Sequence, residues 1–555
     1  MRAVFSALIF RPALALADQA SGAHGAVATA SPEASQAALD VLKHGGTAAD
    51  AAIAATLVLA VTEPQSSGLG GGGFALIYDA KKKEIRALDF RERAPVLAHQ
   101  KLYTRDGKVQ PELAQTGALA VGTPGEIAGL YALHQKYGKR PMGELFDEAI
   151  RLASKGFAVS SRLGGAFEYR AGELAHFDST KSAWMKNGKL PQSGDKWLQP
   201  DLAKALKLIQ QKGEQAFYKG DLAKKIATTV TNYGGVLALT DLAEYQVRWL
   251  DAVSTTYRGY QIYSMPPPSS GGVVLGEMLN VMEQVDVAKL GYRSPETIHY
   301  AIEAMRRAYA DRAAYLGDPQ FVSVPVAGLM NKEYAKQMFT GIKPQAASTS
   351  AEVKPGRPEG ATEPTHTTHL SVVDGEGNAV VLTTTVNGPF GSSLVADGTG
   401  IMLNNEMDDF AIAPGVANQF GLIGGDANAV NPRKTPLSSM TPTLILKDGQ
   451  LRYGLGSPGG PTIITTAFWM VLGLLDYHTD LATAVAMPRV HQQWQPDKVL
   501  VERFGLDVTT AKALEAMGYA LDYSPTWGNA QAVGIVEGKR VSASDPRGEG
   551  RALAY

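Results

Sequence analysis

The sequence contains no cysteine. This absence excludes disulfides, thiolate metal sites and a cysteine nucleophile together. An excess of charge is missing too, because the formal net charge is −1, so nothing points to nucleic acid or to an anionic membrane surface. Hydrophobic residues at 45% and charged residues at 19% are typical of an ordinary globular protein.

Several familiar signatures are also missing. The apolar stretch 48–61 carries Asp50 and is too short to cross a bilayer, so it predicts a buried helix. No Gly-x-Ser-x-Gly elbow of a serine hydrolase occurs. The glycines from Gly68 to Gly73 precede a predicted strand, which is the wrong order for a dinucleotide-binding turn. They indicate close backbone packing around a site, with a plain flexible loop as the alternative.

Residues 1–17 predict a signal peptide. An apolar run follows Arg2, and Ala15-Leu16-Ala17 is an acceptable cleavage site. Arg11-Pro12 interrupts the run, so a misassigned amino terminus is the alternative. We expect a periplasmic or secreted protein that begins at Asp18.

The remaining pattern alternates helices with hairpins. Helical periodicity recurs over 124–137, 142–155, 200–212, 273–284, 295–316 and 462–475. Helix-capping signals surround 32–43 and 48–62, and strand pairs with tight turns are predicted around 374–378, 447–449 and 537–538. This mixture predicts an α/β fold, a layered sandwich with antiparallel sheets.

Thr367 stands at an abrupt change of composition. Residues 343–365 are almost all small, polar, charged or Pro, which predicts a flexible tail, and a predicted core strand follows at once. Cleavage of the His366–Thr367 bond would place a free α-amine beside the Thr367 hydroxyl, so that one residue holds nucleophile and base. An α-amine has a pKa of about 7.7–8.0 and is partly neutral at pH 7. The alternative is an ordinary strand threonine after a linker.

Four motifs favour Thr367 as a catalytic residue over an ordinary strand threonine. Thr367-Thr368-His369, the run 404–410 (NNEMDDF), the run 436–440 (PLSSM) and the run 456–460 (GSPGG) occur in this order. Together they resemble the γ-glutamyltranspeptidase family of N-terminal-nucleophile hydrolases. The resemblance implies a four-layer αββα sandwich made as one precursor. It also implies a large subunit, 18–366, that stays associated with a small subunit, 367–555, as a heterodimer.

The same resemblance implies roles for single residues. Thr367 would be the nucleophile, Thr385 would hydrogen-bond its hydroxyl, and Gly459 and Gly460 would offer backbone N–H groups to the oxyanion. The predicted cleavage site is the bond between His366 and Thr367. The enzyme would cleave the γ-glutamyl amide of glutathione or a related donor through a γ-glutamyl-Thr ester. Water, an amino acid or a dipeptide would then accept the γ-glutamyl group.

A γ-glutamyl group carries an α-carboxylate and an α-ammonium, which require donors and acceptors respectively. Arg91 can bind the carboxylate through two N–H groups, with help from the hydroxyls of Ser438 and Ser439. The residues expected to accept from the ammonium are Asn387, Glu406 and Asp409. We expect no metal or organic cofactor, since His366 and His369 have no third ligand.

One departure and two rival functions are kept open. The loop 414–434 corresponds to a lid, and Phe420 stands where some relatives have a tyrosine, so a lid hydrogen bond is in doubt. A glutaryl acylase of the same fold is one rival, although its substrate has no ammonium for Glu406 and Asp409. An uncleaved homologue that only binds ligands is the other.

Overall fold

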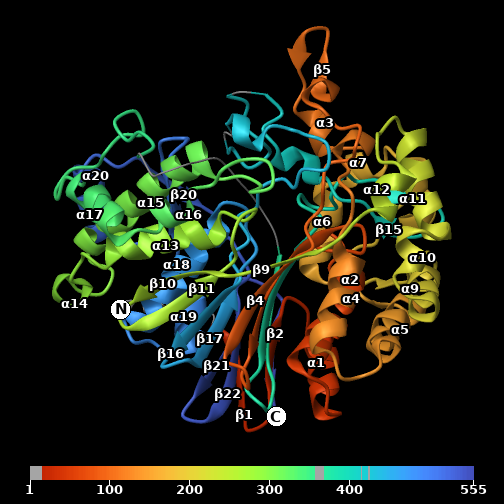
Figure 1. The fold of residues 1–555 in the computed structure, drawn as a ribbon, viewed down its shortest axis with the longest axis horizontal. Coiled ribbons are helices and arrows are strands. Elements are labelled where there is room, and N and C mark those ends of the chain that lie inside the picture. The colour runs from red at the N-terminus through yellow and green to blue at the C-terminus, as the bar shows by residue number, and fades with distance from the viewer. Residues whose placement is uncertain (1–15, 357–367, 414, 423–424) are drawn as a thin grey trace, which may run out of the picture.

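A computed structural model describes residues 16–356, 368–413, 415–422 and 425–555. Strands occupy the centre of the molecule, with helices to either side (Figure 1). Most of the strands belong to two seven-stranded sheets. Sheet A contains, in spatial order, β1 (Asp18–Gly22), β22 (Lys539–Ser544), β21 (Gln531–Val536), β17 (Gln450–Gly456), β16 (Thr443–Lys447), β11 (Tyr260–Ser264) and β10 (Val253–Tyr257).

Sheet B carries the predicted catalytic hairpin at its centre. Its strands, in spatial order, are β23 (Arg551–Ala554), β2 (Ala26–Thr29), β12 (Thr368–Val373), β13 (Ala379–Thr385), β3 (Gly72–Asp79), β4 (Glu84–Asp89) and β9 (Arg248–Leu250). Neighbouring strands of this sheet pair antiparallel. The predicted hairpin around 374–378 is therefore confirmed as the β12–β13 pair.

Two groups of helices flank the sheets. The first group contributes to one apolar cluster with β12, β13 and β3, and includes α1 (Pro32–Lys43), α2 (Ala48–Thr62), α4 (Glu126–Tyr137), α5 (Asp147–Lys155), α6 (Ser161–Tyr169), α9 (Pro200–Lys212) and α11 (Asp221–Asn232). The second group shares a cluster with β11, β16, β17 and β21, and includes α13 (Gly271–Met282), α15 (Pro295–Tyr315), α17 (Lys332–Thr340), α18 (Thr462–Leu475) and α20 (Val508–Ala516).

A third apolar cluster joins the two sheets. It contains Phe74 and Leu76 of β3 and Val381 of β13 together with Leu444 of β16 and Val533 of β21. Every residue of β13 is buried, as expected of a strand that is covered on both faces. The mixed α/β character predicted from the sequence is thus confirmed. Within the described ranges, no helix has the length and apolar character needed to span a membrane.

Local sequence signals explain where the first helices start and stop. Ser31 caps α1 by accepting from the Ala34 N–H, and Thr47 and Asp50 form a reciprocal capping box at the start of α2. The helix α2 ends at Thr62, just before Glu63-Pro64, because the residue before a proline disfavours helical geometry. These signals were all readable in the sequence.

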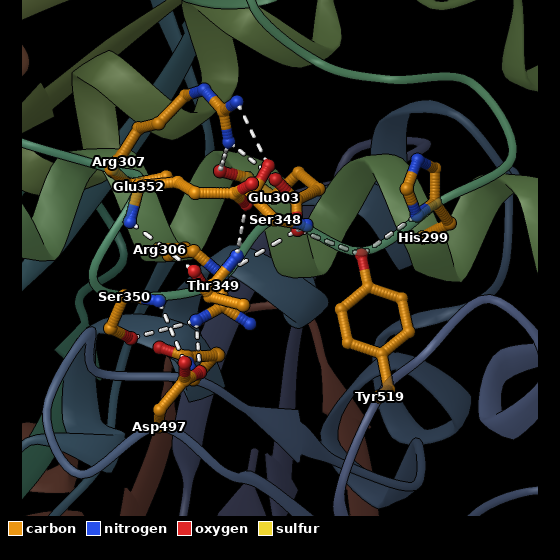
Figure 2. Close-up of polar contacts among 12 residues, drawn as sticks. His299, Glu303, Arg306, Arg307, Ser348, Thr349, Ser350, Glu352, Asp497 and Tyr519 are labelled. Carbon is orange, nitrogen blue, oxygen red and sulfur yellow. Dashed lines mark hydrogen bonds and ion pairs between the residues drawn. The ribbon is translucent and has the colours of Figure 1, made fainter.

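The tail predicted over 343–365 is only partly described, and its described part is well anchored. Ser348 and Ser350 are 4% and 2% exposed. The Ser348 N–H donates to Glu303 of α15 at 3.1 Å, and the Ser350 N–H donates to Asp497 at 2.7 Å. Arg306 of α15 donates to the Ser350 hydroxyl and also pairs with Asp497 (Figure 2).

The same segment, 347–356, makes further contacts at both ends. The Ala347 N–H donates to the Met517 carbonyl at 2.7 Å, and the Gly356 N–H donates to Asp311 of α15 at 2.6 Å. Polar contacts with distant residues therefore anchor residues 347–356, although few of their side chains are apolar. The flexibility of 343–365 stays a prediction. Residues 357–365 lie outside the described part of the chain.

Candidate active site

The register of β12 and β13 decides which residues of the predicted catalytic hairpin lie opposite one another. Thr368 pairs with Thr384, and Ser371 pairs with Val381. Thr385 is the last residue of β13 and is 1% exposed. Its Oγ1 accepts from the Asn387 N–H at 2.7 Å. His366 and Thr367, the predicted cleavage site and nucleophile, lie just outside the described residues.

The face of β12 that includes His369 points toward sheet A. His369 Nδ1 lies 3.0 Å from Thr383 Oγ1, and its Nε2 lies 3.0 Å from Ser371 Oγ. A Cβ on Gly456 would come within 2.5 Å of the His369 ring, so β17 ends directly against this ring. Burial lowers the pKa of His369 to about 3, which keeps the ring neutral.

The segment after β17 turns at two glycines. Gly459 and Gly460 have φ angles of 138° and 63°, which glycine adopts far more readily than other residues. Among the described residues, neither of their N–H groups has an acceptor within hydrogen-bond distance. Their carbonyls accept from Thr462 and Ile463 at the start of α18. The arrangement leaves two adjacent backbone donors available at the end of β17.

Arg91 lies in a buried cluster of charges just after β4. Its Nη1 is 2.6 Å from Glu406 Oε1, and its Nη2 is 2.6 Å from Asp409 Oδ2. All three side chains are 0% exposed. Glu406 and Asp409 begin and end a 3₁₀ helix, η4 (Glu406–Asp409), and its three-residue turn places both carboxylates on one side. The ion pairs fix the plane of the guanidinium.

Asn404 holds η4 in place. Its side chain donates to the carbonyls of Gly70 and Gly122 at 2.7 and 2.9 Å and accepts from the N–H of Gly122 and of Glu406. The glycines predicted to pack closely do so here, since a Cβ on Gly70 would meet the Met402 carbonyl at 2.1 Å. This side chain therefore links the glycine-rich segment to Glu406.

Two acceptor oxygens of the residues expected to bind the ammonium remain without a donor in the described part of the structure. They are Asn387 Oδ1 and Glu406 Oε2, and both are inaccessible to solvent. Asn387 donates through Nδ2 to the Asn405 carbonyl at 2.9 Å, which joins it to the segment that carries Glu406. Buried acceptors normally have donors, so these oxygens suit a ligand that brings N–H groups.

The predicted serines lie in the same region. The Arg91 Nε donates to the Pro436 carbonyl at 2.8 Å, so Arg91 contacts the segment that leads to Ser438 and Ser439. Both serines are 0% exposed. The Ser438 hydroxyl accepts from the Met440 N–H at 3.0 Å, and the Ser439 hydroxyl accepts from Arg312 at 2.8 Å.

Glu92 was not identified as a site residue from the sequence. It is 0% exposed, and neither carboxylate oxygen has a hydrogen-bond partner among the described residues. Burial raises its pKa to about 8, although Arg91 acts in the opposite direction. Burial, followed by repulsion from Glu92, also raises the pKa of Glu406. Both carboxyl groups therefore titrate at a higher pH than exposed glutamates do. The only available signal was the adjacency of Glu92 to Arg91.

The loop 414–434 passes close to this cluster. The Asn418 side chain lies 3.4 Å from Asp409 Oδ1, and the Gln419 N–H lies 3.2 Å from Asp408 Oδ2. Phe420 is half-buried. Residues 414, 423 and 424 are outside the described ranges. No group of three or more described His, Asp or Glu side chains is arranged to hold a metal ion.

Comparisons with known proteins place this architecture in a family. The glutathione hydrolase proenzyme of Escherichia coli (strain K12) is 44% identical over 526 residues, which are 94% of this chain and 90% of that protein. The cephalosporin acylase from Bacillus halodurans matches with a TM-score of 0.87 at 28% identity, over 100% of this chain and 99% of its own. A chain of Helicobacter pylori γ-glutamyltranspeptidase matches with a TM-score of 0.58 at 44% identity, over 59% of this chain and 93% of its own.

The family model described as Gamma-glutamyltranspeptidase matches residues 34–555, which include every candidate residue named above. The chain belongs to the γ-glutamyltranspeptidase family and is an enzyme of γ-glutamyl hydrolysis and transfer.

Proposed function

We propose that the chain is a precursor whose His366–Thr367 bond is cleaved by Thr367 itself. Residues 18–366 then form the large subunit, and residues 367–555 form the small subunit of a heterodimer. The E. coli relative is named a proenzyme, which supports processing. The H. pylori chain also spans only 59% of this chain while 93% of its own length is matched, as a separate large subunit would.

One observation carries the assignment of Thr367. Thr368 pairs with Thr384, so a continuation of this register by one residue would place Thr367 opposite Thr385. Side chains two apart on a strand share a face, so in that continuation Thr367 would share the face of His369. That ring lies against Gly456, and the donors of Gly459 and Gly460 follow three and four residues later. The proposed site therefore combines Thr367 with Thr385 at the end of β13 and with the Gly459 and Gly460 donors that follow β17.

The chemistry follows from these neighbours. Thr385 Oγ1 accepts from the Asn387 N–H, so in the proposed site its own proton is donated to Thr367 Oγ. The free α-amine of Thr367 takes the hydroxyl proton while Oγ attacks the γ-amide carbon. The N–H groups of Gly459 and Gly460 stabilise the oxyanion, each contributing on the order of 3 kcal/mol. Release of the amine leaves a γ-glutamyl ester, which water or an acceptor amine resolves.

The cluster around Arg91 binds the donor. Arg91 takes the α-carboxylate with Ser438 and Ser439, while Asn387 Oδ1, Glu406 Oε2 and Asp409 accept from the α-ammonium. The two oxygens that have no described donor support the ammonium site. The donor is glutathione or another γ-glutamyl compound, and the acceptor is water, an amino acid or a dipeptide. The reaction as proposed uses no cofactor.

The proposal also includes the arrangement of the layers, the role of the loop 414–434 and the cellular location of the protein. Three apolar clusters, one between the sheets and one under each helix group, support the four-layer αββα sandwich. The loop 414–434 acts as the lid over the donor, with Phe420 in place of a tyrosine. Residues 1–17 are removed as a signal peptide in the periplasm or during secretion. The start of β1 at Asp18 supports that boundary.

Amino-terminal sequencing of the smaller fragment tests the proposal most directly. A fragment that begins at Thr367 is expected, and any other start would refute the mechanism. A single unbroken 58.9 kDa chain with full activity would refute it as well.

A glutaryl acylase is the second candidate, because the cephalosporin acylase of B. halodurans covers the whole chain at a TM-score of 0.87. Comparing kcat/KM for γ-glutamyl and glutaryl p-nitroanilides separates the two functions. Preference for the γ-glutamyl compound is expected, because a glutaryl group leaves Glu406 Oε2 and Asn387 Oδ1 without donors.

A further inference from the structure

The last turns of α15 bring a second buried cation to the donor site. Arg312 is 1% exposed. Its Nη2 donates to Ser439 Oγ at 2.8 Å, and its Nε donates to Ser270 Oγ at 3.1 Å. Ser439 is one of the two hydroxyls expected to bind the α-carboxylate.

Arg312 is connected to both sides of the segment that carries these hydroxyls. The Ser270 N–H and hydroxyl both donate to the Ser438 carbonyl, at 2.7 and 2.8 Å. The neighbouring Ser269 hydroxyl donates to the Met440 carbonyl at 2.6 Å. The backbone on each side of Ser439 is therefore fixed by the same turn that accepts from Arg312.

The direction of the hydrogen bond decides what Ser439 can do. A serine hydroxyl has one proton and two lone pairs. Because Ser439 Oγ accepts from Arg312, its own proton remains to be donated, and no described residue accepts it. A guanidinium donor also makes that proton a stronger donor. The hydroxyl is thus prepared to donate to an anion.

Charge balance favours the same conclusion. The positive charge of Arg91 faces the two carboxylates of Glu406 and Asp409, which are also expected to bind the ammonium. A zwitterionic donor adds one charge of each sign. A second cation beside the carboxylate end offsets the excess of acid, and Arg312 supplies it.

Tyr309 lies one turn earlier on the same face of α15. The Arg312 guanidinium lies 5.7 Å from the Tyr309 ring, and the Tyr309 hydroxyl donates to the Pro461 carbonyl, next to Gly460. The helix thus sets the spacing between Ser439 and the predicted oxyanion donors. That spacing must match the length of a γ-glutamyl group.

We propose that Arg312 is a positioning residue that directs the Ser439 hydroxyl at the donor's α-carboxylate and thereby selects donors that carry this group. The proposal rests on the donor site proposed above. If the proposal is right, replacing Arg312 lowers kcat/KM only for donors that carry the α-carboxylate. If Arg312 has a purely structural role, the replacement lowers kcat/KM equally for all donors.

Three p-nitroanilides separate these possibilities. The γ-glutamyl compound has both charged groups, the glutaryl compound keeps only the carboxylate, and the 4-aminobutyryl compound keeps only the ammonium. Arg312→Gln should lower kcat/KM for the first two by about 10- to 100-fold. It should change the third by less than about twofold. The third compound is also measured as a competitive inhibitor, so slow turnover does not conceal its binding. An equal loss on all three, or no loss, would overturn the proposal.

Two further variants serve as controls for a general effect of removing a buried arginine and for the role of the charge. Arg293 also lies against a ring, 5.0 Å from Trp469, and donates to the Pro488 and Gly505 carbonyls, so Arg293→Gln should affect all three compounds alike. Arg312→Lys should recover part of the selective loss because it restores the charge.

A variant that does not fold would not end the test. If Arg312→Gln is not processed, Ser439→Ala is measured instead, and it must lower kcat/KM for the two compounds that carry a carboxylate. The double variant Ser439→Ala/Arg312→Lys must then show no further decrease for these two compounds. A wild-type preference for the glutaryl compound would contradict the proposed function. Arg312 would still be tested by the glutaryl and 4-aminobutyryl pair.

Discussion

Replacing Arg91 with methionine should destabilise the protein as well as impair donor binding. The change removes the cation that lies 2.6 Å from both Glu406 and Asp409. Those carboxylates stay buried, and an uncompensated buried charge is far more costly than a lost contact. Removing one partner of a buried ion pair typically costs about 3–5 kcal/mol. The two acids will then take up protons, so the deficit should shrink as the pH falls.

The expected shift in melting temperature follows from the size of the chain. Unfolding entropy is about 2.1 cal/mol/K per residue, which for 555 residues gives roughly 1.2 kcal/mol/K. A loss of about 3–5 kcal/mol therefore corresponds to a fall of roughly 3–4 °C in Tm at pH 7. The KM for γ-glutamyl donors should rise at least about tenfold, because a charge-assisted pair is lost.

Thermal scans of three proteins test this reasoning. They are the wild type, Arg91→Met, and a triple variant that adds Glu406→Gln and Asp409→Asn. The triple variant should recover most of the Tm, because no buried charge remains unpaired, while activity stays lost. The reasoning is refuted if Arg91→Met melts like the wild type at every pH, or if the triple variant is no more stable than the single one. Each protein is first checked on a denaturing gel for equal processing.

Three further predictions concern the site. Thr367→Ala should leave one band near 58.9 kDa with no γ-glutamyl hydrolysis, and normal processing in that variant would disprove the nucleophile. Asp409→Asn should lower the preference for γ-glutamyl over glutaryl anilide by about tenfold, whereas an unchanged ratio would remove the ammonium role. Burial raises the pKa of Glu92 to about 8, so the folded protein keeps a proton that the unfolded chain loses above its ordinary pKa of 4.5. The stability of the wild type should therefore fall as the pH rises from 5 to 8. In thermal scans, the Tm of Glu92→Gln should increase relative to that of the wild type over the same range. A difference that does not change with pH would contradict this.

Local structure was predictable because its causes are local. The Thr47–Asp50 capping box and the hairpin around 374–378 depend on residues within a few positions of one another, and both are present. The site is different. Arg91 meets Glu406 across 315 positions, and only the family resemblance brought the two together in advance.

The site residues that were not identified from the sequence were missed for one common reason. Buried charges such as Glu92 and Arg312 resemble surface residues in a sequence, because the partners that make burial tolerable lie elsewhere in the chain. The contacts of segment 347–356 were unpredictable for the same reason. Its low apolar content gave no sign of the hydrogen bonds that it makes with Asp311, Asp497 and Met517.

The anchoring of Gly356 by Asp311 has a consequence for the protein after scission. His366 lies ten positions downstream, and an extended chain spans at most about 3.6 Å per residue. Cleavage of the His366–Thr367 bond, as proposed, would therefore leave the new carboxyl end within roughly 36 Å of Gly356. That end would then stay tethered beside α15 through the contact between Gly356 and Asp311.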